Sequence, residues 1–433
     1  MPHATDDPVR AALCAAWSGA VPDPPGATPP PPSLPPRGPA HPLPRFPDRG
    51  LGGLLDLAAA ADPRRRADGV QLRRAPSAGG RYPVDVHVAA GRNLLAHDPI
   101  AHALDGPPPD AGPGTRLLLS LTARRTVWRY GPRSLPVLLL DLGHAVAALL
   151  AAAAAGGRPA RATVGDTAGA PAPGGVLVTA PPPYRRTPAG HPLVDAALDA
   201  LHLPPTTIVA PPPVPPRAIL ARRSAGWDEL VVDHPDGAAA ALAAARTVGG
   251  DTVDAVEVTR ARSAPLLARL AGHSCGQTRL AGAARLLLIA GPARPDESAP
   301  AALVTAGAAV HAAWLAATAA GAAARPVGCW IDAELRLAGR PRRVLHGLLI
   351  GGRRGGRTPV QEDAGIDGHG RRGDPHPGAG EGDDAGPVLL GRCVDGHHVG
   401  PDRAAQIPGV GRPGICAARA VSRARPGPTG ARR

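Results

Sequence analysis

Two proline-rich stretches, residues 22–47 and 203–217, divide the chain. Proline fixes φ and lacks a backbone N–H, so neither stretch suits a regular helix or a central strand, and each is expected to form an extended, polyproline-like spacer. The predicted organisation is an N-terminal segment with its proline-rich linker (1–47), a first module (48–202), a linker (203–216), a second module (217–352) and a tail (353–433).

The tail follows neither the helix period nor the strand period. It is rich in Gly, Pro, Asp and Arg, and such a segment cannot bury enough apolar surface to offset its chain entropy. We predict that residues 353–433 are mostly disordered, and an out-of-frame extension of a GC-rich gene is an alternative. The histidines of the tail and Cys393 lack metal-ligand spacing, so no metal site is predicted.

The two modules resemble one another. Each has a Ser-x-Gly loop, "PSAGG" at 76–80 and "HSCGQ" at 273–277, followed by a strand-like apolar run. Each then has a long Ala-rich helix, at 138–157 and 303–322. The equivalent glycines are Gly143 with Gly307, Gly157 with Gly321 and Gly165 with Gly328. This shared order indicates an internal repeat.

Charge and composition narrow the class of protein. The formal net charge is +13 and all 48 basic residues are Arg, but they are scattered and lack interleaved aromatic residues. A basic, solvated surface is therefore favoured over nucleic-acid binding. Five dispersed cysteines without CxxC spacing indicate a reducing compartment, and no secretory signal is evident, so a cytoplasmic protein is expected.

The Ala-rich helices are long enough to be mistaken for membrane spans. Polar residues interrupt each of them, Asp141 and His144 in the first and Thr305 and His311 in the second. Buried core helices are therefore predicted, and no membrane association is expected.

The first loop has the chemistry of an anion clamp. Arg73 and Arg74 offer charged, planar forks, Ser77 adds a hydroxyl, and Gly79 lets the backbone approach a flat ligand. After Pro83 the alternation "VDVHV" predicts a strand. An Arg-rich surface loop is the alternative interpretation.

The segment "RRAPSAGGRYPVDVHV" (73–88) resembles the flavin-binding segment of the nitroreductase superfamily, particularly the SagB-type thiazoline/oxazoline dehydrogenases. The segments "NLLAHDPIAHALDG" (93–106) and "RRTVWRYGPRSLPVLLLDLGHAVAALLAAA" (124–153) follow in the order of that family. The resemblance spans residues 70–165 and, more loosely, 217–352. It implies an α+β fold of two tandem nitroreductase-like modules that form an internal pseudo-dimer.

The resemblance also implies FMN, bound non-covalently between the modules. The implied cofactor contacts are Arg73, Arg74, Pro76, Ser77 and Gly79 in the first module, and Arg222, Arg223, Ser224, Val327 and Gly328 in the second. Segment 326–328 resembles the family's loop beside the flavin ring, where a backbone N–H can bond flavin N5. An ordinary turn is the alternative for this segment.

The candidate catalytic pair is Arg129-Tyr130, where azoline-oxidising relatives have Lys-Tyr. Arg cannot act as a neutral base, so Tyr130 is the expected proton-transfer group and Arg129 would orient substrate. Asp141 and His144 lie three residues apart on one helix face, which suits a proton relay or, as we favour, a structural polar pair. His311 is expected to be structural.

The resemblance implies an FMN-dependent oxidoreductase that dehydrogenates thiazoline or oxazoline rings in a modified, ribosomally made peptide, with a cyclodehydratase as a possible partner. Two alternatives stay open. One is an NAD(P)H-dependent reductase of nitro compounds or quinones, and the other is a flavin-free scaffold that binds a peptide or an enzyme. A further homodimer of the tandem chain is also left open.

Overall fold

A computed structural model of the chain describes residues 7–18, 29–35, 37–67, 70–109, 114–165, 175–181, 187–274, 277–328 and 330–352. The predicted tail, residues 353–433, lies outside this part of the chain. Two residues of the predicted second loop, Cys275 and Gly276, also lie outside it.

The first half contains a mixed sheet of eight strands in the order β1-β6-β5-β4-β7-β9-β8-β10. Its strands are β1 (His41–Pro42), β4 (Val84–Ala90), β5 (Asn93–Asp98), β6 (Ala103–Leu104), β7 (Gly114–Leu121), β8 (Ala160–Val164), β9 (Gly175–Ala180) and β10 (Thr206–Ile208). Strand β9 pairs in parallel with β7 and β8, and the other pairs are antiparallel. A separate hairpin joins β2 (Ala61–Ala67) to β3 (Val70–Arg73) and leads into the predicted flavin segment.

The second half contains an antiparallel sheet in the order β11-β12-β15-β13, with β14 also paired to β15. Its strands are β11 (Asp254–Thr259), β12 (Arg285–Pro292), β13 (Ala323–Val327), β14 (Glu334–Leu337) and β15 (Arg340–Gly351). Ser224 forms a parallel bridge to Ala324, so the predicted Arg-Arg-Ser segment lies beside β13. Strand β13 ends at Val327. Two of the predicted cofactor segments, 222–224 and 327–328, therefore belong to two segments of the chain that lie side by side.

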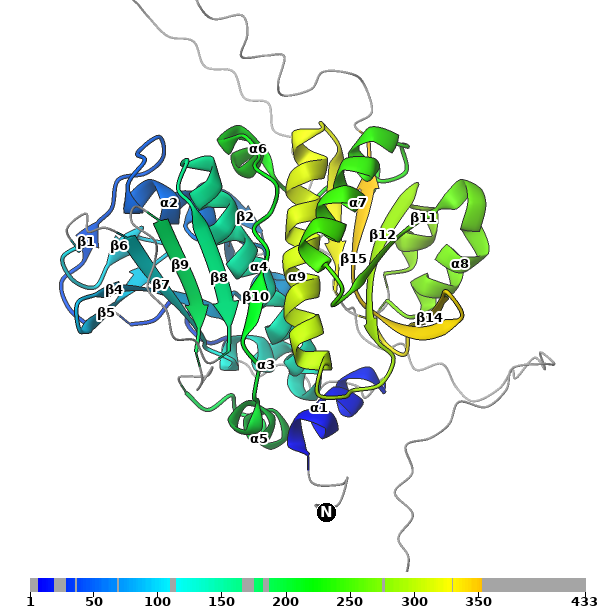
Figure 1. Cartoon of the computed structure of the whole chain (residues 1–433), viewed down its shortest axis with the longest axis horizontal. Coiled ribbons are helices and arrows are strands. Elements are labelled where there is room, and N and C mark those ends of the chain that lie inside the picture. The colour runs from blue at the N-terminus through cyan, green and yellow to red at the C-terminus, as the bar shows by residue number, and fades with distance from the viewer. Residues whose placement is uncertain are drawn as a thin grey trace, which may run out of the picture.

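Helices cover the two sheets and separate them. The longest are α4 (Ser134–Ala155) and α9 (Ala299–Ala319), which stand side by side in the centre of the molecule (Figure 1). The others are α1 (Pro8–Trp17), α2 (Leu51–Ala58), α3 (Arg124–Tyr130), α5 (Pro192–Ala200), α6 (Pro216–Ala221), α7 (Pro235–Gly249) and α8 (Arg260–Gly272). Short 3-10 turns lie at Ala78–Gly80, Gly131–Arg133 and Thr278–Gly282.

Helices α4 and α9 are mostly apolar on all sides, and in the fold they are accordingly buried on all sides. Both are long and apolar enough to cross a membrane by length and composition alone. In this fold 94% of the most apolar stretch of the first and 83% of that of the second are buried inside the protein, as in a core helix.

Two glycines let α4 and α9 touch backbone to backbone. A Cβ added to Gly143 would overlap the carbonyl oxygen of Val304, and one added to Gly307 would overlap that of Leu140. Each glycine therefore meets the residue three positions before the other, so the contact is reciprocal. The positions paired by sequence alignment are the positions at which the helices cross.

The largest hydrophobic core contains residues from both halves, including Leu138 and Leu149 from α4 and Leu303 and Val310 from α9. The two halves therefore share one core. A smaller cluster under α8 belongs to the second half alone.

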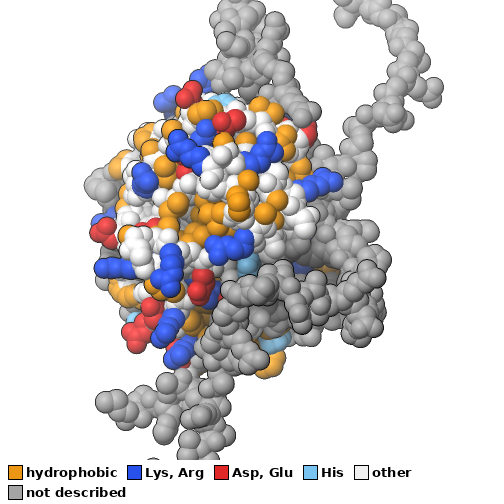
Figure 2. All heavy atoms as spheres, turned by 90° about the vertical axis from the view of Figure 1, so that its right-hand side faces the viewer, with side chains coloured by type: hydrophobic (Ala, Val, Ile, Leu, Met, Phe, Trp, Pro, Cys, Tyr) orange, Lys and Arg blue, Asp and Glu red, His pale blue; other side chains and the backbone are white. Residues whose placement is uncertain are grey.

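The predicted 203–216 linker is more ordered than a spacer, because its longest run without proline, residues 206–210, contains edge strand β10 (Thr206–Ile208), which pairs with β8. The N-terminal segment likewise contributes α1, whose Trp17 is buried. On the visible part of the face shown in Figure 2, Arg side chains are scattered among acidic and apolar ones and form no continuous stripe.

Candidate functional site

The loop after β3 is fixed by a buried carboxylate on α4. Ser77 Oγ donates to Asp141 Oδ2 at 2.6 Å, and the Ala78 N–H donates to Asp141 Oδ1 at 3.1 Å. The Tyr82 N–H donates to Ser77 Oγ at 2.8 Å. The Ser77 hydroxyl, predicted to contact a cofactor, is thus engaged in holding its own loop.

The loop turns back at Gly79, which has φ +57°. A Cβ at this position would lie 2.8 Å from Tyr130 Oη and 3.1 Å from the Arg129 side chain. Glycine is therefore required by conformation and by space. The structure thereby brings the predicted catalytic pair against the predicted cofactor loop.

Asp141 is the most perturbed acid of the site. Burial raises its pKa from 3.8 to about 7, although the hydrogen bonds from Ser77 and Ala78 act in the opposite direction. A carboxyl group in a cleft with such a shifted pKa is typical of a functional site.

One helical turn further along α4, His144 contacts the other half of the molecule. Its Nε2 lies 2.8 Å from Nε2 of His346 on β15, and His346 Nδ1 lies 3.0 Å from the Val327 carbonyl oxygen. A carbonyl only accepts, so His346 carries its proton on Nδ1 and accepts at Nε2, and His144 must then donate from Nε2. Burial lowers the pKa of His346 to about 4, consistent with a neutral pair.

Asp141 and His144 do not form the polar pair that their spacing predicts. Asp141 fixes residues 77–78 of the first half, whereas His144 fixes, through His346, the end of β13 in the second half. Helix α4 therefore holds two of the predicted cofactor segments. His311 lies beside His144 with ring centroids 5.7 Å apart.

Arginines from both halves meet near the start of the second half. Arg65 Nη1 donates to the Arg222 carbonyl oxygen at 2.8 Å. Burial is the main cause that lowers the pKa of Arg65 and of Arg222. Neighbouring positive charges lower it further, those of Arg74 and Arg223 at Arg65 and those of Arg65 and Arg74 at Arg222. We refer to Arg65, Arg74, Arg222 and Arg223 as the arginine cluster.

The arginine cluster is short of negative charge. Arg74 pairs with Asp62 at 2.9 Å and Arg223 with Glu229 at 2.5 Å. Among the residues that the structure describes, four cations thus face two paired carboxylates, which leaves a net charge of +2. Arg222 is buried over the Trp314 ring at 4.4 Å, and none of the described residues accepts a hydrogen bond from its guanidinium. Burial, the main cause, lowers its pKa to about 9.

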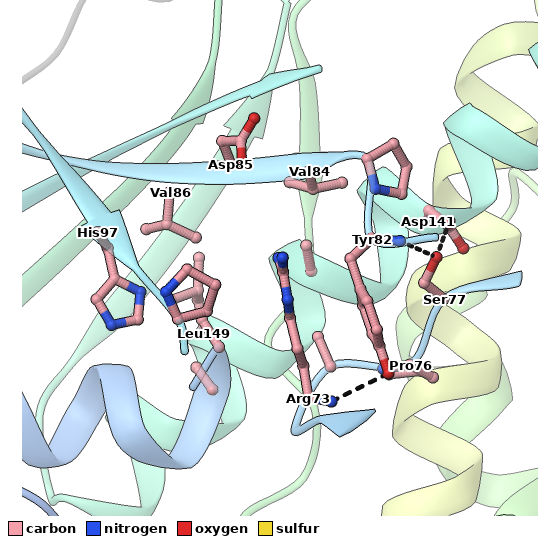
Figure 3. A pocket seen from close by; sticks show the side chains of 16 residues that line it. Arg73, Pro76, Ser77, Tyr82, Val84, Asp85, Val86, His97, Asp141 and Leu149 are labelled. Carbon is pink, nitrogen blue, oxygen red and sulfur yellow. Dashed lines mark hydrogen bonds between the residues drawn. The ribbon is translucent and has the colours of Figure 1, made fainter. Parts of the chain in front are cut away.

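Arg73 does not join this cluster. Its guanidinium stacks on the Tyr82 ring at 4.7 Å and points into a pocket inside the first half (Figure 3). Adjacent arginines thus leave the hairpin in different directions, and only Arg74 meets the second half. Tyr82 itself adopts φ +49°, which is unusual for an aromatic residue.

A second pocket joins the predicted catalytic residue to the second half. Tyr130 and Gly328 line the same space of about 360 Å³, together with Trp17 and Trp330. Helix α1 is thus a wall of this pocket. Arg133 also lines it, so the pocket has a basic and aromatic character.

Sequence reasoning missed several of these residues. Arg65 is one of three successive arginines, and nothing in the pattern distinguishes it from its exposed neighbours Arg64 and Arg66. His346 lies in an apolar strand, far along the chain from His144, so no spacing connects them. Trp17 precedes the proline-rich linker and gave no signal.

No family model matches the sequence, and no curated protein is close enough to count as a relative. The structure is similar to a crystal structure from Anabaena variabilis of a protein assigned as a nitroreductase, with a TM-score of 0.52 and 15% identity over 76% of this chain and 95% of that chain. The structure of B. megaterium NfrA2 is matched over 37% of this chain and 74% of that one, at 17% identity and a TM-score of 0.25, which is too low to bear on the fold.

The chain therefore has a nitroreductase-like fold, and the predicted α+β class is confirmed. That similarity concerns the fold alone, so cofactor and reaction are argued below from the residues of the site.

Proposed function

We propose that this protein is an FMN-dependent oxidoreductase whose flavin is held between its two halves. The observation that carries the proposal is Arg222, a buried guanidinium with no carboxylate partner among the described residues, which lies with Arg65 and Arg74 of the other half. A buried cation needs a compensating anion.

The arginine cluster fits the phosphate of FMN. A phosphate monoester carries close to two negative charges at neutral pH, and arginine forks suit its oxygens. Counted over the described residues, the cluster has a net charge of +2, and the buried Nε atoms of Arg74 and Arg222 find no acceptor among them. When bound, FMN would supply hydride transfer, and the protein would supply orientation and charge.

The other proposed contacts follow from the same geometry. Gly79 allows close approach of a flat ring to the loop that Asp141 fixes. The end of β13, fixed by His346, would present the backbone of Val327 and Gly328 to the ring edge. Pro76, Ser77 and Ser224 would shape these segments rather than donate charge.

We infer that the two halves form an internal pseudo-dimer. The reciprocal contact of Gly143 and Gly307 is what a two-fold relation between α4 and α9 would produce. A single chain would then build internally the interface at which its flavin lies.

For the reaction, we propose dehydrogenation of a thiazoline or oxazoline ring in a modified peptide. The Tyr130 hydroxyl lies near Gly79, and Tyr130 lines the pocket that contains Gly328, which supports its proposed role in proton transfer. Arg129 beside it would stabilise negative charge and orient the substrate. A cyclodehydratase would supply the azoline.

The replacement of the relatives' Lys by Arg129 favours a second candidate, an NAD(P)H-dependent reductase of nitro compounds or quinones. The two reactions differ in their hydride donor. Oxidation of NAD(P)H without any peptide would support the reductase, and conversion of an azoline peptide with uptake of oxygen would support the dehydrogenase.

The cofactor proposal is tested by binding of FMN and riboflavin to the full chain, followed by flavin absorbance and fluorescence. We expect FMN to bind at least about tenfold more tightly than riboflavin, because only FMN carries the phosphate. Arg65→Gln and Arg222→Gln should abolish this preference. The exposed neighbour, changed as Arg64→Gln, is the matched control and should retain it.

Two outcomes contradict the proposal. A folded protein that stays colourless after incubation with FMN would instead support the flavin-free scaffold. Equal affinity for FMN and riboflavin would show that the arginine cluster does not bind the flavin phosphate.

A further inference from the structure

The pocket that contains Arg73 lies inside the first half, between α2, α4 and β4. The space between these elements, with the open solvent at its mouth included, is about 500 Å³. Its walls are mostly apolar, and they include Ala59, Pro83, Val84, Val86, Ala145 and Leu149. The Arg73 side chain stands in the middle of this space, beside the Tyr82 ring and below Val84 (Figure 3).

The other charged or polar groups of the pocket have partners of their own. Asp85 pairs with Arg125 at 2.8 Å, and Asp141 accepts from Ser77 and Ala78. His97 bonds to His102 at 3.2 Å. The acids that line the pocket therefore already have donors.

Arg73 has no carboxylate partner among the residues that the structure describes. Its backbone N–H donates to the Tyr82 hydroxyl at 3.0 Å, and its guanidinium donates to the Pro32 carbonyl oxygen and to no other described residue. Burial and the nearby charge of Arg125 lower the Arg73 pKa to about 10, although the charges of Asp85 and Asp98 act in the opposite direction. The guanidinium is still charged at neutral pH, and a neutral carbonyl compensates a buried charge only in part.

The Pro32 carbonyl belongs to the proline-rich N-terminal segment. Arg125 Nε donates to the adjacent Pro31 carbonyl oxygen at 2.9 Å, so two consecutive carbonyls rest on two buried arginines. An acceptor thus reaches Arg73 from outside the pocket walls. A ligand anion would satisfy the same guanidinium more completely.

We propose that this pocket binds a small apolar carboxylic acid, with its carboxylate on Arg73 and its hydrocarbon against the Ala, Pro, Val and Leu walls. The site is separate from the arginine cluster, because Arg74 and Arg73 point in different directions from the hairpin. Pro76 and Ser77 of the proposed cofactor loop also line the pocket, but the proposal needs no flavin and is tested independently of the proposed redox function.

The probes are octanoate and its neutral counterpart octanamide, titrated into the full chain by isothermal calorimetry. We expect octanoate to bind at least about tenfold more tightly than octanamide, because only the acid pairs with Arg73. Arg73→Met keeps the apolar volume and removes the charge, so it should abolish the preference. Arg66→Met, at an exposed position on the same hairpin, is the control and should behave as the unchanged protein.

A second variant tests the pocket without touching the charge. Ala59 is half-buried at the end of α2, and Ala59→Phe should block the space and abolish octanoate binding while Arg73 stays in place. FMN binding is measured in parallel, and its loss or retention bears only on the proposed redox function. Equal binding of the two probes, no octanoate binding at all, or unchanged octanoate affinity in Arg73→Met would overturn the inference.

Discussion

Replacement of Asp141 by Asn should change how the stability of the protein depends on pH. Asp141 is buried and accepts hydrogen bonds from Ser77 and Ala78. Asn has the same shape and can still accept from the Ala78 N–H, but it carries no charge at any pH. The variant therefore removes a titrating group from the core and leaves the packing in place.

The direction in which stability changes with pH follows from the raised pKa of Asp141. The folded protein holds a proton on Asp141 up to about pH 7, whereas the unfolded chain releases it above pH 3.8. The contribution of Asp141 to the free energy of unfolding is therefore fully present below pH 3.8 and is lost as pH rises through about 7. At 1.36 kcal/mol for each pH unit, the loss amounts to at most about 4 kcal/mol.

The measurement is calorimetric unfolding of the unchanged protein and Asp141→Asn at pH 5 and pH 8. The buried histidines titrate in the opposite direction in both proteins, so the quantity of interest is the difference between the two proteins at each pH. We expect the variant to gain stability relative to the unchanged protein by about 2–4 kcal/mol on going from pH 5 to pH 8.

Ser77→Ala provides a second test of the effect of Asp141 on stability. The Ser77 hydroxyl holds the Asp141 pKa down, so its removal should raise that pKa further and move the loss of stability to higher pH. The reasoning is refuted if the difference between the unchanged protein and Asp141→Asn is the same at pH 5 and pH 8.

Three further variants test the helix contact, the histidine pair and the proposed acid–base group. Gly143→Ala should lower the free energy of unfolding by about 3 kcal/mol, because its Cβ overlaps a carbonyl on α9, whereas Gly157→Ala, with open space and φ +70°, should lose only about 1 kcal/mol in urea titrations. His346→Asn should retain a donor to Val327 and bind FMN at least about tenfold more tightly than His346→Leu, and equal affinities would remove His346 from the site. Tyr130→Phe should bind FMN normally but reduce kcat by about a hundredfold or more with little change in KM, and an unchanged kcat would exclude Tyr130 as the proton-transfer group.

The sequence was informative where a physical requirement leaves a clear pattern. Gly143 and Gly307 aligned because only glycine permits the backbone contact at both positions. The alternation after Pro83 predicted a strand, and β4 begins at Val84. The strand alternation depends only on neighbours along the chain, and the two glycines are matched by comparing the two halves of the sequence with each other.

Contacts between distant segments could not be predicted in this way. The direction of Arg73 and Arg74 depends on the twist of a hairpin whose pairing shifts register between Ala61 and Arg66. His346 gains a role only because β15 passes His144. The same-face rule for residues three apart also failed to describe Asp141, since its partners lie on another loop and not on its own helix.

Two residues of α4 fix the proposed cofactor segments. They lie on either side of Gly143, the residue at which α4 contacts α9. Asp141 lies two positions before Gly143 and binds the loop at Ser77, and His144 lies one position after it and binds His346. The packing of α4 against α9 therefore fixes how far along the helix axis, and in which direction around it, both the Asp141 and the His144 side chains lie. Because packed helices resist small displacements, a shift of this crossing would move both loops together. The Ala-rich composition of α4 thus serves the site as well as the core: small side chains bring the halves close enough for one helix to hold both.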